Sequence, residues 1–264
     1  MSSLPVFLTD RLPPVGAETV LDGPEGRHAA TVRRLRPGER LMLSDGRGGL
    51  AGCEVLDTGR DLLRLRVLRR GTEPAPALRV TLAQALVKGE RGELAVELAT
   101  EAGVDAVVPW RAARCVARWD EGPRGSKALA RWQETARQAA KQARRAWLPE
   151  VAEPVGTAEL ARRCAAAAGC LVLYEAASDP LSSIPLPNAG ELLLVVGPEG
   201  GVTEAELADL TAAGARPVRL GPAVLRASSA AAVALGAIGA LSERWSLRYS
   251  CDLWCDEPKK FYPE

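Results

Sequence analysis

The sequence predicts a two-part protein, in which a small barrel-like β module precedes a larger α/β domain built on a parallel sheet. Short alternating strand candidates, broken by glycine and proline, fill about the first seventy residues. A connector rich in proline and glycine, GTEPAPAL, follows at 71–78. Beyond it, unbroken apolar runs alternate with helical patterns. That alternation is typical of a parallel sheet covered by helices on both faces.

The N-terminal module, residues 1–72, shows the alternation of half-buried strands. The stretch at 41–59, LMLSDGRGGLAGCEVLDTG, alternates, breaks at Asp45-Gly46 and Gly48-Gly49, and then resumes. The next stretch, DLLRLRVLRR, alternates apolar and basic residues. Because aspartate–glycine and glycine–glycine pairs between alternating runs mark tight hairpin turns, we expect a small all-β barrel here.

The second part, residues 73–245, alternates strands with helices. Apolar runs predict strands at 79–86, 105–110, 171–175, 192–197 and 217–221. Periodic patterns predict helices at 90–103, at about 127–147, from Thr203 onward and at about 228–245. The last nineteen residues, 246–264, contain two of the three tyrosines and differ in composition from both parts. A docking tail, a frayed end and a foreign extension all fit such a terminus.

Composition limits the class of protein. Of the 264 residues, 47% are hydrophobic and 25% are charged, as in ordinary globular proteins. No apolar run approaches the roughly 18–20 residues that span a bilayer. The N-terminus, MSSLPVFLTDRLPP, also lacks the layout of a signal peptide. We therefore expect a cytoplasmic protein without membrane contact.

Six cysteines and one histidine offer few metal ligands. Cys251 and Cys255 are close in sequence, but no second close pair accompanies them, and a structural zinc site takes four ligands. Scattered cysteines in a cytoplasmic chain of this size are mostly small buried residues. We expect no metal and no disulfide framework.

Positive charge is concentrated in two zones, although the formal net charge is only +1. Residues 1–72 contain twelve arginines and nine acidic residues. Residues 111–147 contain ten basic and three acidic residues. A solvated face explains many such runs, but two arginine-rich zones in one chain also indicate RNA as a partner.

The stretch LLLVVGPEGGVTEAEL at 192–207 predicts a buried strand, a glycine turn and a helix start. Thr203 and Glu206 have the spacing of a capping box. The turn lacks the lysine of a phosphate-binding Walker loop, and Glu199 would repel a phosphate. A tight turn without a ligand is one interpretation. The Gly200-Gly201 pair favours the other, in which a ligand approaches the backbone closely.

A second informative stretch is RLGPAVLRASSAAAVALGAIGAL. Arg226 precedes a helix that we expect Ser228 or Ser229 to cap. A cation at a helix N-terminus opposes the helix dipole, so local stability does not explain this arginine, although an exposed side chain pointing away would. The serines are not expected to act as nucleophiles, because His28, the one histidine, lies about two hundred residues away.

Three loops are expected to meet at one edge of the predicted sheet. Ligands of parallel sheets bind at the carboxyl ends of the strands. Glu175, the PEGG turn at 198–201 and the segment GPAVLRASS at 221–229 each follow a predicted strand. This edge is therefore the predicted ligand site.

These motifs resemble the paired signatures of the SPOUT methyltransferase superfamily. More narrowly, the chain is similar to the bacterial family that methylates N3 of a uridine in small-subunit (16S) ribosomal RNA. The similarity continues upstream through His28, Val32, Arg34 and Gly38, then ALVKGER (85–91), TEAGVDAVVPW (100–110) and RWQETARQAAKQARR (131–145). It covers residues 5–245 in the family's order, and each motif is modest alone while the series is specific.

The resemblance implies an N-terminal PUA-like RNA-binding domain, a C-terminal domain with a deep trefoil knot, S-adenosylmethionine as cofactor, and a homodimer. The residues that it implies for the cofactor are Leu173, Glu175, Gly197, Pro198, Glu199, Gly200, Gly201, Leu220, Gly221, Val224, Leu225 and Arg226. Those implied for RNA are His28, Arg33, Arg34, Arg36, Lys88, Arg91, Arg137, Gln142, Arg144 and Arg145. Arg226 is the candidate catalytic residue, and Glu175 is the candidate base.

The chain departs from the family's pattern in several places. Where many members have L-R-T-E-T-A, this sequence has L-R-A-S-S-A at 225–230, which loses an acidic residue. Leu98 stands where many have lysine, Ala102 where they have leucine, and Arg33 also replaces a leucine. Two alternatives stay open: a SPOUT methyltransferase acting on another RNA nucleotide, and a non-catalytic RNA-binding factor of ribosome assembly.

Overall fold

The computed structural model describes residues 4–119 and 122–245, which form two compact units. The first unit is a β domain made of the chain up to residue 75 together with 140–148. The second is an α/β domain made of 76–139 and the chain from 149 onward. The tail that the sequence sets apart, 246–264, lies outside the described residues.

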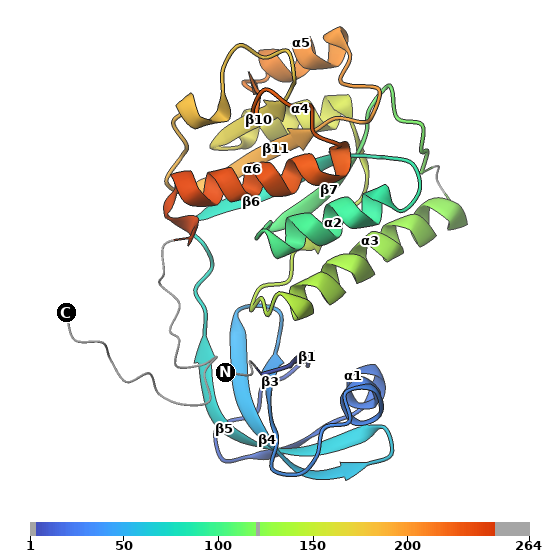
Figure 1. The fold of residues 1–264 in the computed structure, drawn as a ribbon, viewed down its shortest axis with the longest axis vertical. Coiled ribbons are helices and arrows are strands. Elements are labelled where there is room, and N and C mark those ends of the chain that lie inside the picture. The colour runs from blue at the N-terminus through green and yellow to red at the C-terminus, as the bar shows by residue number, and fades with distance from the viewer. Residues whose placement is uncertain (1–3, 120–121, 246–264) are drawn as a thin grey trace, which may run out of the picture. The chain divides into compact units, whose positions relative to one another are not determined.

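The β domain is built on a five-stranded sheet of order β1-β3-β4-β5-β2 (Figure 1). β1 pairs parallel with β3, and the other neighbours pair antiparallel. Its elements are β1 (Val6–Leu8), β2 (Glu18–Leu21), α1 (Gly23–Arg27), the π-helical turn η1 (His28–Val32), β3 (Arg40–Ser44), β4 (Gly49–Gly59) and β5 (Leu62–Thr72). The register between β4 and β5 shifts twice, and such bulges increase the twist that curls a sheet.

The segment at 140–148 packs against the β domain, which the sequence did not predict. The helix expected to reach residue 147 ends at Gln142, because Arg144 adopts the left-handed region at φ 55 and turns the chain. The Leu148 N–H then donates to the Gly46 carbonyl at 3.0 Å, and the Trp147 indole donates to the Glu73 carbonyl at 3.0 Å. The prediction of a helix to residue 147 was therefore wrong.

A glycine in the β domain makes this packing possible. Gly48 has φ +93, and a Cβ there would lie 2.6 Å from the Glu73 carbonyl oxygen and 2.7 Å from the Trp147 ring. Only glycine combines that backbone conformation with so close an approach. Gly48, which is interpreted from the sequence as part of a turn, therefore also leaves room for the Trp147 ring to pack against the backbone.

A buried ion pair joins the same segment to α1. Lys141 Nζ lies 2.8 Å from Glu25 Oε2, and the two side chains are only 7% and 12% exposed. The ammonium also lies 5.8 Å from the centroid of the Phe7 ring. Removing either charge would leave the other one buried without a partner, which costs free energy. This ion pair therefore links the two segments strongly.

The α/β domain is built on a seven-stranded parallel sheet of order β12-β10-β11-β6-β7-β8, with β9 also pairing with β7. Its strands are β6 (Leu78–Ala85), β7 (Ala106–Arg111), β8 (Glu150–Val151), β9 (Val155–Gly156), β10 (Gly169–Leu173), β11 (Gly190–Val196) and β12 (Arg216–Val218). Its helices are α2 (Arg91–Glu101), α3 (Pro123–Gln142), α4 (Thr157–Ala166), α5 (Glu204–Ala212) and α6 (Ala227–Leu241), with short 3-10 turns η2 (Leu181–Ser183) and η3 (Glu243–Trp245).

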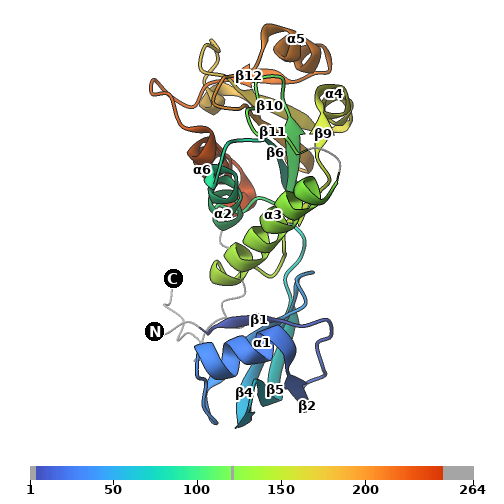
Figure 2. The ribbon, with the colours of Figure 1, turned by 90° about the vertical axis from the view of Figure 1, so that its right-hand side faces the viewer.

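Helices cover both faces of this sheet, as the apolar runs predicted. In β11, Leu192, Leu194 and Val196 face the core beneath α2, α3 and α6, while Leu193 and Val195 face the core beneath α4 and α5. Figure 2 shows α2 and α6 on one side of the sheet and α4 on the other. Burial on both faces explains why the strand is an unbroken apolar run.

The strands and helices differ from the sequence prediction mainly at their ends. The strand expected at 171–175 ends at Leu173, so Glu175 lies in the following loop. The expectation of an all-β first module was wrong, because α1 and η1 lie between β2 and β3. These two elements and α4, β8 and β9 were not predicted, because short or weakly periodic elements give little signal. The structure confirms the predicted architecture, in which a β domain is followed by an α/β domain with a parallel sheet. The trefoil knot stays a prediction. Among the described residues, no helix is long and apolar enough to cross a membrane.

Replacing Lys141 by methionine should destabilise the protein by about 3–5 kcal/mol, because the Glu25 carboxylate would stay buried without its cation. Urea denaturation measures this change. The double variant Lys141→Met/Glu25→Gln removes both charges and should recover most of the loss. A single variant as stable as the wild type would contradict the buried pair.

Candidate active site

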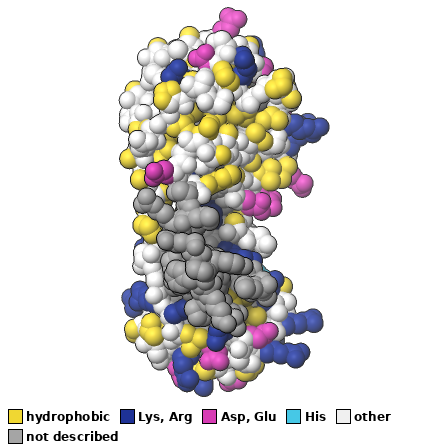
Figure 3. Space-filling model, turned by 60° about the vertical axis from the view of Figure 1, so that its left-hand side comes forward, with side chains coloured by type: hydrophobic (Ala, Val, Ile, Leu, Met, Phe, Trp, Pro, Cys, Tyr) yellow, Lys and Arg dark blue, Asp and Glu magenta, His cyan; other side chains and the backbone are white. Residues whose placement is uncertain are grey.

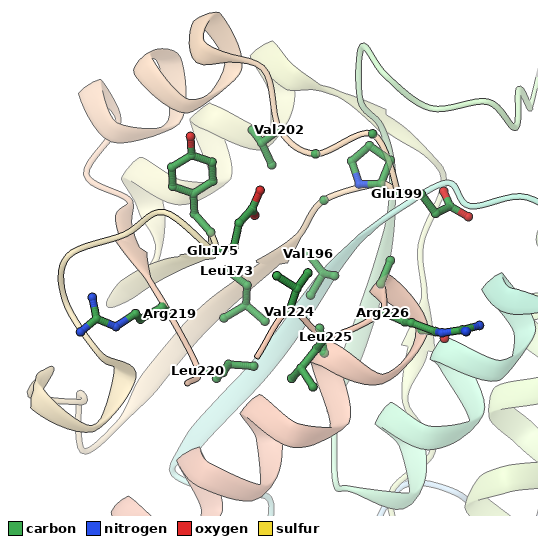
Figure 4. Close-up of a pocket in the computed structure, with 18 of the residues that line it drawn as sticks. Leu173, Glu175, Val196, Glu199, Val202, Arg219, Leu220, Val224, Leu225 and Arg226 are labelled. Atoms are coloured by element: carbon green, nitrogen blue, oxygen red, sulfur yellow. The ribbon is translucent and has the colours of Figure 1, made fainter. Parts of the chain in front are cut away.

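A cleft of about 510 Å³ opens at the carboxyl ends of β10, β11 and β12. Three segments form its wall: 173–175 after β10, 196–202 after β11, and 218–228 between β12 and α6. Figure 4 shows these segments converging around the cleft. The structure thus brings the three loops together at one edge of the sheet, where the rule for parallel sheets places ligands.

All twelve residues that the resemblance implies for the cofactor line this cleft. Their contact with a cofactor stays a prediction. Arg91, expected at RNA, lines the cleft as well. Sequence reasoning missed Arg114, Tyr174 and Arg219, which also line it. Arg219 begins the quoted stretch RLGPAVLRASS but was not singled out, and no local motif marks Arg114 or Tyr174.

The PEGG turn is a β-turn whose glycines are required by the chain itself. The Gly201 N–H donates to the Pro198 carbonyl at 2.9 Å, so Glu199 and Gly200 occupy the centre of the turn. Gly201 has φ +75, and a Cβ on Gly200 would lie 3.1 Å from Arg114 Cβ. The two glycines are therefore explained without a ligand, and it is the cleft that indicates one.

Glu199 anchors the turn to the segment between β6 and α2. Its Oε1 accepts the Lys88 backbone N–H at 3.4 Å and lies 3.6 Å from Arg91 Nη1. In the sequence analysis this carboxylate is a group that would repel a phosphate and a residue implied for the cofactor. In the structure its nearest cation is an arginine of the chain. Because this ion pair is partly exposed, it adds little to the free energy of unfolding and serves mainly to position the turn.

Glu206 is the buried carboxylate behind the turn. The predicted capping box with Thr203 is present, with both reciprocal hydrogen bonds formed. The same carboxylate accepts the Ala113 backbone N–H at 2.7 Å and the Thr157 hydroxyl at 3.2 Å. Burial alone would raise the pKa of Glu206, but the hydrogen bonds from Ala113, Thr203 and Thr157 outweigh it and lower the pKa. The group is therefore a firmly ionised anchor.

Arg226 itself occupies the N-cap of α6, and the prediction of Ser228 or Ser229 as the cap was wrong. Its backbone is extended, at φ −68 and ψ 146, and no side chain caps the helix. The Arg226 carbonyl accepts the Ser229 N–H at 3.0 Å. The guanidinium is exposed, and Figure 4 shows it on the opposite side of the cleft from Arg219. The helix start therefore presents this cation at the cleft.

The residues expected at RNA are distributed over both units. In the α/β domain, Arg91 lines the cleft, Lys88 contacts Glu199 through its backbone N–H, and Arg137 lies on α3. In the β domain, the members are His28, Arg33, Arg34, Arg36, Gln142, Arg144 and Arg145. Arg34 and Arg144 both have left-handed backbones, at φ 57 and 55, and both are exposed. The segment that follows α3 therefore adds Arg144 and Arg145 to the β domain's own basic residues.

His28 is held against the core of the β domain. Its ring lies edge-to-face on Phe7, with centroids 5.7 Å apart. Burial, together with the nearby Lys141 ammonium, lowers the pKa of His28. The imidazole is therefore neutral at pH 7, and any contact with RNA would be a hydrogen bond and not an ion pair.

The described residues hold no group of three or more His, Cys, Asp or Glu side chains arranged to bind a metal. Cys53, Cys164 and Cys170 are buried and carry free thiols, as does the half-buried Cys115. Cys251 and Cys255, the pair considered for a metal, lie outside the described residues.

Both parts of the chain match family models. Residues 73–239 match the RNA methyltransferase domain and residues 21–68 match the RNA methyltransferase PUA domain. Fold and cleft are those of an RNA methyltransferase. A relative from Mycobacterium bovis, named ribosomal RNA small subunit methyltransferase E, is 54% identical over 97% of this chain and 98% of its own. The chain belongs to the ribosomal RNA small subunit methyltransferase E family.

Solved structures agree with this assignment. Ribosomal RNA small subunit methyltransferase E from Neisseria gonorrhoeae, bound to S-adenosylmethionine, superposes with a TM-score of 0.81 at 29% identity and covers 90% of this chain and 98% of its own. A methyltransferase of Legionella pneumophila in complex with the same cofactor has a TM-score of 0.81 at 27% identity, with the same coverage.

Replacing Glu206 by glutamine should lower the free energy of unfolding at pH 7 by about 1–3 kcal/mol, because hydrogen bonds to a charged acceptor are removed. Since the folded pKa lies below the usual value of about 4.3, the carboxylate stabilises the fold above that pH and the effect fades as the pH falls through the folded pKa.

Chemical denaturation over a pH series measures this. The gap between wild type and Glu206→Gln should shrink below about pH 4, where the wild-type carboxylate takes up its proton. The exposed Glu204→Gln, on the same helix, is the matched control. A gap that is independent of pH would show that the charge of Glu206 does not matter.

Proposed function

We propose that this protein transfers the methyl group of S-adenosylmethionine to N3 of a uridine in small-subunit (16S) ribosomal RNA. The observation that carries the proposal is the cleft at the ends of β10, β11 and β12, which the PEGG turn and the Arg226 loop enclose. The relatives named above support the cofactor and the RNA class. The choice of uridine N3 rests on the sequence resemblance.

The cleft fits the chemistry of this cofactor. S-adenosylmethionine has no phosphate and combines an adenine ring with a positive sulfonium. Val224 and Leu225, which line the cleft, are 80% and 36% exposed, so they offer apolar surface for a ring. Backbone groups of Gly197 and Gly221 are within the lining, and Glu175 adds a negative charge. We expect these segments to hold the cofactor.

Arg226 is the proposed electrostatic stabiliser of the reaction. S-adenosylmethionine supplies an already activated methyl group, so the protein must position uracil and make N3 nucleophilic. The N3–H is weakly acidic, and a fixed positive charge stabilises the anion left when it is lost. Arginine stays protonated at all working pH values, so Arg226 cannot serve as the base. Glu175, in the loop after β10, is the candidate to accept the proton.

The protein is proposed to act as a homodimer in the cytoplasm, where ribosomal RNA is assembled. Among the described residues of the α/β domain, most exposed large apolar side chains lie on α2, α6, η3 and the loop before α6: Leu94, Val224, Leu225, Val233, Leu241 and Trp245. Figure 3 shows apolar side chains gathered on this domain. Apolar surface of this extent supports contact with a second copy.

Arg226→Ala should keep cofactor affinity within about twofold and reduce methylation at saturating cofactor by about 100-fold or more, as for loss of a group that stabilises charge only in the transition state. Calorimetry with S-adenosylmethionine and a methylation assay on small ribosomal subunits measure the two quantities. Arg226→Lys should retain part of the rate. Lost cofactor affinity or full turnover in Arg226→Ala would refute the assigned role.

Affinity for RNA should fall steeply with salt, because Lys and Arg side chains that neutralise phosphates release counterions. Charge reversal of Arg33 and Arg34, or of Arg144 and Arg145, should weaken binding and lower the salt slope by about one for each phosphate that the variant no longer neutralises. Arg162→Glu, on α4 outside both arginine-rich zones, is the matched control. A binding constant that does not depend on salt would overturn the proposed RNA surface.

A further inference from the structure

Arg114 lies against the PEGG turn from a loop far away in sequence. It follows β7 and lines the cleft. Its Nη1 donates to the Gly200 carbonyl at 3.0 Å. Its aliphatic stem packs closely against Gly200, where a Cβ would lie 3.1 Å from Arg114 Cβ and 3.5 Å from Arg114 Cδ. The side chain therefore touches the centre of the turn by both packing and hydrogen bonding.

The loop that carries Arg114 is itself fixed by buried groups. The N–H of Ala113, its chain neighbour, donates to Glu206 at 2.7 Å. Thr157 donates to the same carboxylate oxygen and accepts the Trp110 indole N–H at 3.2 Å. Trp110, at the end of β7, is fully buried. The position of Arg114 is thus set by the sheet core and by the start of α5.

We propose that Arg114 is a positioning residue for the cofactor: it holds the Gly200 peptide group, and with it the PEGG wall of the cleft, in the orientation that binds S-adenosylmethionine. This inference rests on the proposed cofactor site. The Gly200 carbonyl belongs to the Gly200–Gly201 peptide group, whose N–H makes the turn's own hydrogen bond to the Pro198 carbonyl. Arg114 therefore holds the carbonyl side of a peptide group that the turn holds through its N–H.

The chemistry of arginine suits this task. Its guanidinium is planar and always charged, and its stem can cover a glycine while the head reaches a carbonyl. Lysine has a donor of similar reach but no fixed plane. Arg114→Lys keeps a stem and a donor and should restore part of what Arg114→Ala loses, whereas Arg114→Met keeps the stem without the donor and should restore less, which separates the hydrogen bond from packing.

The test is calorimetric titration of S-adenosylmethionine into the full chain, with kinetics on small ribosomal subunits beside it. In Arg114→Ala, the dissociation constant should rise about tenfold, as expected for removing one charge-assisted hydrogen bond. The binding stoichiometry should stay unchanged. KM for the cofactor should rise while kcat changes little, because the effect concerns binding and not the reacting atoms. Arg118→Ala, exposed in the same loop and not lining the cleft, is the matched control.

A double variant tests whether Glu206 and Arg114 act together on cofactor binding. If Glu206 acts through Arg114, the penalty of Arg114→Ala should be smaller in a Glu206→Gln background than in the wild type. An unchanged dissociation constant in Arg114→Ala, or an equal effect of Arg118→Ala, would overturn the inference alone. Failure of the wild type to bind the cofactor would overturn the proposed function together with it.

Discussion

The cleft depends on one buried carboxylate. Glu206 receives the hydrogen bonds that begin α5, and the same group holds the loop after β7 through Ala113 and the start of α4 through Thr157. Three segments that are distant in sequence therefore meet at one negative charge. A buried carboxylate stays ionised only when hydrogen-bond donors surround it. The charge on Glu206 therefore depends on its partners, and the positions of the partners depend on that charge.

Contacts from two different segments of the chain hold the PEGG turn in place. Arg114 contacts Gly200 from the loop after β7, and Glu199 contacts Lys88 before α2 and Arg91 at the start of α2. The glycines serve the packing of the chain, and the absence of lysine is consistent with a cofactor that carries no phosphate. A turn built in this way offers a preformed wall to a ligand, which reduces the ordering cost of binding.

Much of the fold could be predicted because both faces of the parallel sheet are buried. The unbroken run at 192–197 became β11, and the T-x-x-E spacing became the capping box of Thr203 and Glu206. These features are local. The end of α3 was not predictable in the same way, since it depends on Arg144 adopting a left-handed backbone and on Trp147 packing against Gly48.

The candidate site likewise contains residues that local motifs predict and residues that only long-range contacts place. Ten of the twelve cofactor residues lie in two motifs that a resemblance can carry, Leu173 and Glu175 lie at and after the end of β10, and the structure gathers all twelve in one cleft. Arg114 belongs to neither motif, and nothing in its sequence neighbourhood indicates where its side chain goes. The contacts of Glu206 with Ala113 and Thr157 also join residues that are far apart in the sequence. Long-range hydrogen bonds of this kind leave no periodicity and no spacing for sequence reasoning to detect.

The central claim is the reaction, and the most direct measurement is mass-spectrometric mapping of methyl groups on small-subunit ribosomal RNA from cells with and without this protein. The account predicts that one 3-methyluridine is missing without the protein. Purified protein with S-adenosylmethionine should then restore it on the isolated subunits. An unchanged methylation map, or the loss of a methyl group from a different kind of nucleotide, would contradict the account.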